Sequence, residues 1–360
     1  ICFVTRGPGA TNASIGVHVA KQDSVPMILF VGQVSVSSTG RDAFQEIDIP
    51  AMFKPLAKWA VQIDEAERLP ELLARAFKVA TSGRPGPVVI SLPEDVQREL
   101  IEAPERVINV PIVPSPSPAQ IDQLGELISK AKQPAILLGA STWTAEACDQ
   151  MADFAQRHDI PVVASFRCQD KIDNDHPNYV GVLGVGTPPF ISKLIDDADL
   201  LIVLGVELSE IVTEGFTKFS HPKMSQGLVH VHPDEEELGR IYQADLAIHS
   251  GMAAFASLVA ERTFDIKVGH ALKTTDLREK FEEFTTPTTC PGEVHIGEIL
   301  AWLDTRLPAD SFLSCGAGNY THWVLRFLKH RKFGTQLAPL GAVMGYGVPA
   351  AIAASLQYPD

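Results

Sequence analysis

The amino-acid sequence predicts an α/β protein in which three parallel-sheet units follow one another along the chain. Short apolar runs alternate with helix-length stretches, and this alternation is typical of parallel sheets covered by helices. The apolar runs in the middle of the chain contain no charged residue in their interior, as expected of strands buried on both faces. A length of 360 residues suits two or three domains. We expect the first and the last sheet to be incomplete.

The first unit is predicted over residues 1–98. Its expected strands are Ile1–Thr5, Pro26–Val31 and Pro87–Leu92, and its expected helices are Ala10–Lys21 and Leu69–Ser82. Ile1–Thr5 has the pattern of a buried strand. Because a domain seldom begins inside a core strand, we expect the sequence to be an internal piece of a longer protein.

The second unit is predicted over residues 119–263, after a proline-rich linker at 99–118. Its expected strands are Ala135–Gly139, Pro161–Ala164, Asp199–Gly205 and Gly227–His232. Its expected helices are Ile121–Ala131, Ala145–His158, Phe190–Asp197 and Met252–Thr263. This succession of strands and helices indicates a Rossmann-like domain.

The third unit is predicted over residues 292–360, after a charged and threonine-rich linker at 264–291. The linker is expected to contain a short helix at Leu277–Phe284. The expected elements of the third unit are a helix at Ile296–Arg306, a strand at Ser311–Cys315, a helix ending at Phe327, a strand near Thr335–Ala338 and a helix from Tyr346. With two strands, its sheet is unfinished.

Charge and cysteine content exclude several classes of protein. Lys and Arg number 30 and Asp and Glu 44, so the net charge is −14 and disfavours binding to nucleic acid or anionic membranes. The sequence contains no run of 18 apolar residues, so no membrane-spanning helix is predicted, and no signal peptide is recognisable. The five cysteines show no C-x-x-C spacing, which disfavours disulfides and zinc and favours a reducing, cytoplasmic location. The sequence also lacks an H-E-x-x-H zinc motif and a G-x-S-x-G nucleophile elbow.

Two glycine-containing segments lie between an expected strand and an expected helix. In Thr5–Asn12, Gly7 and Gly9 would let the backbone approach a ligand beside a helix N-terminus, although a tight turn explains them equally well. Gly316–Tyr320 has the same design at the carboxyl end of a strand, the edge at which open α/β sheets bind ligands. There the side chains of Asn319 and Tyr320 can donate hydrogen bonds to phosphate oxygens.

Three other segments leave two interpretations open. Leu340–Ala351 surrounds Met344 with small residues, so this thioether either packs beneath an aromatic ring or belongs to an ordinary core. Asp42–Asp48, which contains Phe44, Gln45 and Glu46, either lines a site or is a solvated loop. His230 and His232 alternate at a strand end, which is more often a hydrogen-bonded strand end than a pair of metal ligands.

Taken together, these segments resemble the thiamin-diphosphate-dependent enzymes. Four segments resemble the pyrimidine-binding domain of that family: Thr5–Ala13, Asp42–Glu46, Arg84–Val88 and Pro93–Val96. Ala198–Gly205 resembles the middle domain, and Gly316–Tyr320 with Met344–Ala351 resembles the start of the diphosphate-binding domain. Ala43-Phe44-Gln45-Glu46 is typical of the large subunits of acetolactate synthase (acetohydroxyacid synthase), so the resemblance is strongest to that group.

The resemblance implies decarboxylation and carboligation of a 2-oxo acid, as in branched-chain amino-acid biosynthesis, with thiamin diphosphate and Mg²⁺ as cofactors. It implies a site shared by two subunits, hence a homodimer or a tetramer. Met344 would lie under the bend of the cofactor, Gly7, Phe44 and Gln45 near its reacting carbon, and Lys58 in the access channel. The residues implied at the diphosphate are Gly316, Gly318, Asn319, Tyr320 and Gly341.

Some family features are missing from this sequence. The resemblance implies that the catalytic glutamate lies upstream of Ile1 and the Mg²⁺ ligands downstream of Asp360, so no base and no metal ligand is assigned here. Glu46 lies on a different loop from that glutamate. Acetolactate synthases carry Arg-Phe-Asp-Asp-Arg near FAD where this chain has Val206–Glu210, and the turn Gly184–Gly186 lacks their histidine. We therefore expect FAD binding to be weak or absent.

Two alternative functions stay open at this stage. One is a related thiamin-diphosphate enzyme with other substrates, such as a glyoxylate carboligase, a sulfoacetaldehyde acetyltransferase or a C–C lyase. The other is a non-catalytic dinucleotide-binding module built from residues 120–263. The absence of G-x-G-x-x-G after Ala135–Gly139 argues against NAD binding by such a module.

Overall fold

The computed structural model describes residues 1–103, 110–262, 264 and 273–359. The chain folds as two compact units, Ile1–Val113 and Pro114–Asp360. The predicted middle and third segments both lie in the second unit. Parts of the two predicted linkers, 104–109 and 265–272, lie outside the described residues, as does Thr263, the expected end of a helix.

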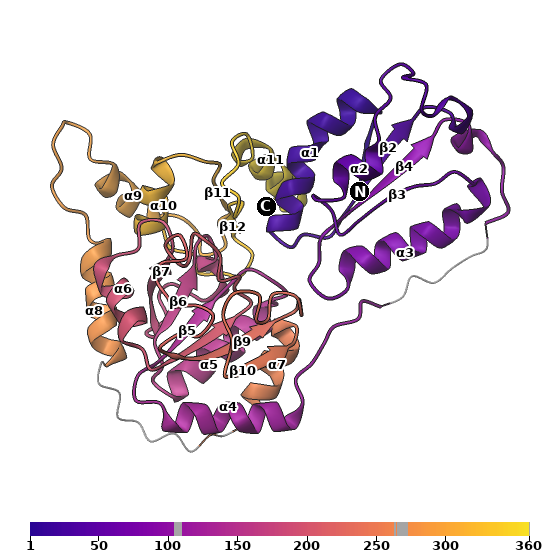
Figure 1. Cartoon of the computed structure of the whole chain (residues 1–360). Coiled ribbons are helices and arrows are strands. Elements are labelled where there is room, and N and C mark those ends of the chain that lie inside the picture. Colours follow the sequence, from indigo (N-terminus) through magenta and orange to yellow (C-terminus); the bar gives the residue numbers. More distant parts are fainter. Residues whose placement is uncertain (104–109, 263, 265–272, 360) are drawn as a thin grey trace. The chain divides into compact units, whose positions relative to one another are not determined.

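A parallel four-stranded sheet forms the centre of the first unit, in the order β1-β2-β4-β3 (Figure 1). Its strands are β1 (Cys2–Val4), β2 (Met27–Gln33), β3 (Trp59–Gln62) and β4 (Pro87–Pro93). Its helices are α1 (Gly7–Gln22), α2 (Ile49–Phe53) and α3 (Leu69–Thr81), with 3₁₀ turns at Val36–Ser38, Ala66–Arg68 and Val96–Arg98. The sequence patterns do not predict β3 or α2.

Helices cover both faces of this sheet, as predicted. Ile28 on one face belongs to the same buried cluster as Leu72 of α3. Its neighbour Leu29 points to the other face, where it clusters with Val17 of α1 and Phe53 of α2. Because successive side chains of a strand point to opposite faces, the uninterrupted apolar run of β2 supplies both clusters.

The expectation that Ile1–Thr5 is a buried strand is wrong with respect to burial. A strand does form there, but β1 lies at the edge of the sheet, and Cys2 and Phe3 are exposed. The ring of Phe3 stacks on that of Phe30 in β2 at 4.7 Å between centroids. An edge strand has a neighbour on one side only, so an apolar run does not by itself identify a central strand.

A parallel six-stranded sheet forms the centre of the second unit, in the order β10-β9-β8-β5-β6-β7. Read from β7, the strands follow the sequence third, second, first, fourth, fifth and sixth, which is the order of dinucleotide-binding folds. The strands are β5 (Pro134–Leu138), β6 (Val162–Ser165), β7 (Tyr179–Leu183), β8 (Leu200–Leu204), β9 (Gly227–His232) and β10 (Leu246–His249). The sequence patterns do not predict β7 or β10.

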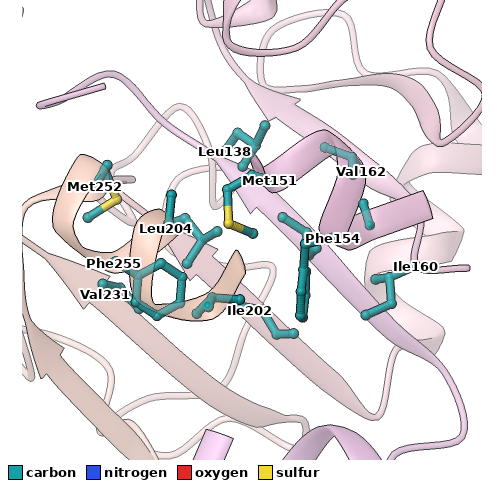
Figure 2. Packing of buried hydrophobic residues seen from close by; sticks show 14 of the residues in the cluster. Leu138, Met151, Phe154, Ile160, Val162, Ile202, Leu204, Val231, Met252 and Phe255 are labelled. Atoms are coloured by element: carbon teal, nitrogen blue, oxygen red, sulfur yellow. The ribbon is translucent and has the colours of Figure 1, made fainter. Parts of the chain in front are cut away.

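Helices also cover both faces of the larger sheet. They are α4 (Pro118–Lys130), α5 (Ala145–Arg157), α6 (Pro189–Asp197), α7 (Met252–Ala260) and α8 (Thr274–Thr285), with a 3₁₀ turn at Gln169–Lys171. Figure 2 shows Phe154 of α5 and Phe255 of α7 packed over strand residues such as Ile202. Leu194 and Ile195 of α6 belong to the cluster on the opposite face.

A small parallel sheet of β11 (Leu313–Ser314) and β12 (Gln336–Leu337) lies in the C-terminal part of the second unit. The helices there are α9 (Ile296–Asp304), α10 (Tyr320–Phe327) and α11 (Gly347–Gln357). Each element expected in this part of the chain forms within a few residues of its predicted bounds.

Charged groups join this small sheet to the larger one. Asp175, which follows the 3₁₀ turn after β6, forms ion pairs with Lys329 and Arg331 at 2.6 and 2.7 Å. Burial opposes ionisation of Asp175, but the hydrogen bonds from Lys329 and Arg331 outweigh it and lower the pKa of this carboxyl group. Arg331 also pairs with Asp304 of α9 at 2.7 Å. No helix among the described residues is long and apolar enough to cross a membrane.

Candidate functional site

Gly7 lies where β1 ends and α1 begins, at the carboxyl edge of the first sheet. Its backbone N–H donates to the carbonyl oxygen of Gln45 at 3.0 Å. A Cβ atom at position 7 would lie 2.7 Å from that same oxygen, so a side chain there would force the backbone at Gln45 to move. The structure therefore brings two of the predicted site residues, Gly7 and Gln45, into direct contact.

The loop that carries Phe44 and Gln45 is held in a compact turn by Glu46. The carboxylate of Glu46 accepts hydrogen bonds from the backbone N–H groups of Gly40 and Ala43, and these bonds lower the pKa of Glu46. Gln45 adopts a φ of +63°. The side chain of Phe44 is 80% exposed. Glu46 thus stabilises the loop, and Phe44 projects from it.

Two residues that sequence reasoning did not assign to the site also hold this loop. The amide nitrogen of Gln33, at the end of β2, donates to the carbonyl of Ile47 at 2.7 Å. Arg6 pairs with Glu94, which follows β4, at 3.1 Å, and its guanidinium lies 3.4 Å from the carbonyl oxygen of Phe44. The sequence signal for Gln33 is a single polar residue directly after an apolar run, and the structure shows that this residue is buried and hydrogen-bonded.

The structure does not bring Lys58 to this group. Lys58 precedes β3, so it lies at the amino end of its strand, whereas Gly7 follows the carboxyl end of β1. Its ammonium group donates to the carbonyl oxygens of Ser82 and Arg84 at 2.8 and 2.7 Å. These bonds stabilise the end of α3 and the turn before β4. A role for Lys58 in an access channel stays a prediction.

The predicted diphosphate residues lie at the carboxyl edge of the small sheet in the second unit. Gly316 is buried, and its N–H donates to the hydroxyl oxygen of Tyr320 at 2.8 Å. Gly318 has a φ of +127°, which residues with a Cβ rarely adopt. Asn319 is the N-cap of α10, and its side chain makes no capping hydrogen bond. The structure thus places the four predicted residues, Gly316, Gly318, Asn319 and Tyr320, around the start of one helix.

The second glycine-rich loop follows β12 and comes close to the first. The hydroxyl of Ser314 donates to the carbonyl of Gly347 at 2.6 Å, and a Cβ on Gly347 would lie 3.2 Å from the nitrogen of Gly316. Gly341 lies in the turn at the start of this loop, and Met344 is 81% exposed. Among the described residues Met344 therefore does not belong to a buried core.

The order in which strands are added to the larger sheet reverses between β5 and β8. Dinucleotide-binding folds form their crevice at this point. At this point the two backbones touch, because a Cβ on Gly139 would lie 2.3 Å from the carbonyl oxygen of Gly205. The hydroxyl of Ser141 is buried and has no hydrogen-bond partner among the described residues. After β8, Val206 and Leu208 are buried and Glu210 is exposed.

The two strand-end histidines are hydrogen-bonded, as the sequence indicates. His230 bonds to the carbonyl oxygen of Val206 at 3.0 Å, and burial lowers its pKa to about 4. His232 accepts from the N–H of Asp234 at 3.1 Å. Over the part of the chain that the structure describes, no three His, Cys, Asp or Glu side chains lie close enough together to hold a metal ion.

Family comparisons match two parts of the chain. Residues 1–52 match the family described as thiamine pyrophosphate enzyme, N-terminal TPP binding domain. Residues 121–259 match the family described as thiamine pyrophosphate enzyme, central domain. The first match contains Gly7 and the Phe44–Gln45 loop, and the second contains the six-stranded sheet.

Curated relatives match the whole chain. An acetolactate synthase of Arthrospira platensis is 30% identical over 374 aligned residues, and the isozyme 2 large subunit of Escherichia coli is 28% identical over 364. An acetolactate synthase large subunit of Corynebacterium glutamicum is 31% identical over 377. Each alignment covers all of this chain and 64%, 65% and 59% of the respective relative. The chain thus spans about three fifths of the length of these relatives.

Proposed function

Because the chain belongs to the thiamine pyrophosphate enzyme family, we propose that it takes part in thiamin-diphosphate-dependent decarboxylation and carboligation of a 2-oxo acid, as an acetolactate-synthase-like enzyme. The similarity to relatives named acetolactate synthase, which extends over the whole chain, carries this proposal. A related enzyme of the same family that uses another donor or acceptor is the alternative.

The residues at the small sheet suit a diphosphate group. Asn319 and Tyr320 are exposed polar side chains at the start of α10. They follow Gly318, whose positive φ is rarely adopted by residues that have a Cβ atom. Neutral donors at a helix N-terminus are a common arrangement for phosphate binding. We therefore propose that these residues bind the diphosphate and that the C-terminal part of the chain begins the diphosphate-binding domain.

At the first sheet, the proposed role of the protein is to place polar and apolar groups beside the reacting centre. Gly7 and Gln45 are fixed to each other through their backbones, and Phe44 projects from the same loop. When bound, thiamin diphosphate supplies the electron sink for the decarboxylation, and Mg²⁺ is proposed to help hold its diphosphate. Phe44 would exclude water from the substrate, and the Gln45 amide would orient its polar groups.

The test uses the full-length natural protein supplied with thiamin diphosphate, Mg²⁺ and pyruvate. We expect CO₂ release that depends on both cofactors and an acetolactate-type product. Cofactor-dependent turnover of other 2-oxo acids, but not of pyruvate, would favour the related enzymes. Failure of the protein to bind thiamin diphosphate would contradict the proposal altogether.

Two observations favour a second candidate function, nucleotide binding by the larger sheet. The strand order is that of dinucleotide-binding folds, and the Ser141 hydroxyl at the end of β5 is buried without a partner among the described residues. The contact between Gly139 and Gly205 and the lack of a G-x-G-x-x-G motif argue against it. Thiamin-diphosphate-dependent turnover would distinguish the first function from this one.

We expect the protein to bind FAD weakly or not at all. Glu207 and Glu210 follow β8, next to the point where the strand order of the sheet reverses. Carboxylates at this point repel the phosphates of a dinucleotide. The touching backbones at Gly139 and Gly205 also leave little room. The visible absorption spectrum of the purified full-length protein checks this, and a stoichiometric amount of flavin would contradict it.

We expect the intact protein to be a homodimer or a dimer of dimers. Support comes from Phe44 and Met344, two predicted site residues that are large, apolar and about four-fifths exposed in this chain. A second subunit would cover such side chains. Light scattering at the concentration of the activity assay measures the assembly, and a fully active monomer would contradict this expectation.

A further inference from the structure

We propose that Arg167 is a positioning residue that holds the two glycine-rich loops of the second unit in the conformation needed to bind a diphosphate. The proposal rests on the proposed function, because that function assigns the loops to the diphosphate. Arg167 follows β6 of the larger sheet, and the sequence patterns gave no reason to connect it with these loops.

Arg167 is buried at the carboxyl end of β6 and reaches both loops at once. It is 5% exposed, and one terminal nitrogen of its guanidinium donates to the carbonyl oxygen of Pro339 at 2.6 Å. The other donates to the carbonyl oxygen of Gly316 at 2.8 Å. The guanidinium also lies over the ring of Phe166, 5.0 Å from its centroid. A rigid, planar group with two parallel donors thus bridges two segments far apart in the sequence.

The two carbonyl groups occupy equivalent places in the small sheet. Gly316 lies two residues beyond the end of β11, and Pro339 lies two residues beyond the end of β12. Because β11 and β12 are parallel, both loops leave the same edge of the sheet. Arg167 therefore fixes the point at which each loop begins, and with it the separation of the loops.

The bond to Gly316 also sets the direction of a backbone dipole. In a planar trans peptide, the carbonyl group and the following N–H point in opposite directions. Since the carbonyl of Gly316 points to Arg167, the N–H of Ala317 points away from it. The guanidinium thereby keeps the Gly316 carbonyl oxygen from turning to the side to which the Ala317 N–H points. A carbonyl oxygen on that side would carry partial negative charge and would repel a phosphate.

Neighbouring residues of Arg167 hold the same part of the chain, but at other places. Gln169 donates to the carbonyl of Leu325 in α10 at 3.0 Å, and the carboxylate of Asp170 accepts from the N–H of Gly334 at 3.0 Å. These contacts attach α10 and the approach to β12. They secure the packing of the segment, whereas the two bonds of Arg167 go to the loops themselves.

Arg278 offers a matched control within the same unit. Its guanidinium also donates to backbone carbonyls, among them those of Asn174 and Tyr179 at 2.9 and 3.1 Å, and lies over the ring of Phe281. These contacts join α8 to β7 and to the segment at Asn174 that precedes it, and involve no residue of either glycine-rich loop. Arg278→Met should therefore cost stability without changing the loops.

The experiment compares Arg167→Met, Arg167→Lys and Arg278→Met in the full-length protein. Thiamin diphosphate is titrated in the presence of Mg²⁺ by intrinsic fluorescence, and hydrogen exchange of peptides covering 315–321 and 338–347 is measured without cofactor. We expect Arg167→Met to weaken cofactor binding about tenfold or more and to speed exchange in both loops. Lysine keeps the charge but not the two-pronged geometry, so Arg167→Lys should fall between wild type and Arg167→Met.

The outcomes separate this proposal from the proposed function. Arg278→Met should leave the affinity within about twofold and the loop exchange unchanged. Equal effects of the Arg167 and Arg278 variants, or unchanged loop exchange in both Arg167 variants, would overturn the positioning role. If Arg167→Met does not fold, Arg167→Lys carries the comparison. If the wild type binds no thiamin diphosphate, the proposed function fails while the exchange measurement still decides whether Arg167 holds the loops.

Discussion

Gly7→Ala is expected to lower kcat/KM of the full-length protein by about 100-fold. The added Cβ would lie 2.7 Å from the carbonyl oxygen of Gln45, and the atom it meets belongs to the backbone. The loop must therefore shift, which displaces Gln45 and Phe44 together and weakens the 3.0 Å hydrogen bond that joins the loop to α1. Misplacement of positioning groups by about 1 Å is enough for a loss of this size.

Gly16→Ala is the control for this substitution. Gly16 lies on the same helix, and a Cβ there would meet no atom within 4 Å. Alanine is the better helix former, so Gly16→Ala should raise the free energy of unfolding by about 0.5–1 kcal/mol and leave kcat/KM unchanged. Steady-state kinetics and chemical denaturation of both variants check the prediction. A Gly7→Ala variant with full activity would remove Gly7 and its contact with Gln45 from the proposed site.

Much of the fold was predictable because buried parallel strands leave a strong signal. β5 and β8 are charge-free apolar runs buried along their whole length, and the sequence patterns locate both to within one residue. The strands that were missed are short or interrupted. β7 contains Gly181, and β10 has two exposed residues among four, so neither has the continuous apolar character of a central strand.

The candidate site was less predictable, because its contacts join residues that are distant in the sequence. Gly7 and Gln45 were each singled out, but nothing in the local pattern shows that one donates to the other across 38 positions. Arg167 was not singled out at all. A single arginine after a strand reads as a solvated charge, and the carbonyl groups it binds belong to the backbone, which carries no sequence signature.

Met344→Ala is expected to weaken cofactor binding without the loss of stability that the same change causes at a core methionine. A buried Met→Ala change costs about 2–5 kcal/mol of stability. Met344 is 81% exposed within one chain, so Met344→Ala should remove less than about 0.5 kcal/mol of the packing free energy inside the subunit. If Met344 supports the bend of thiamin diphosphate, as the family resemblance implies, the same variant should bind the cofactor about tenfold more weakly and lose activity in proportion.

Leu100→Ala provides a matched control, because Leu100 is a fully exposed apolar residue of similar size that lies outside every predicted site segment. It should leave both stability and cofactor binding unchanged, whereas Met344→Leu should preserve most of the binding, since leucine keeps much of the bulk of methionine. Calorimetric titration with thiamin diphosphate and Mg²⁺, together with chemical denaturation, measures both quantities on each variant. A Met344→Ala protein with wild-type affinity would exclude the supporting role. A loss of several kcal/mol in stability would instead show that Met344 is packed in the full-length protein, either in a core or against a second subunit, because a side chain that stays exposed has no packing of that size to lose.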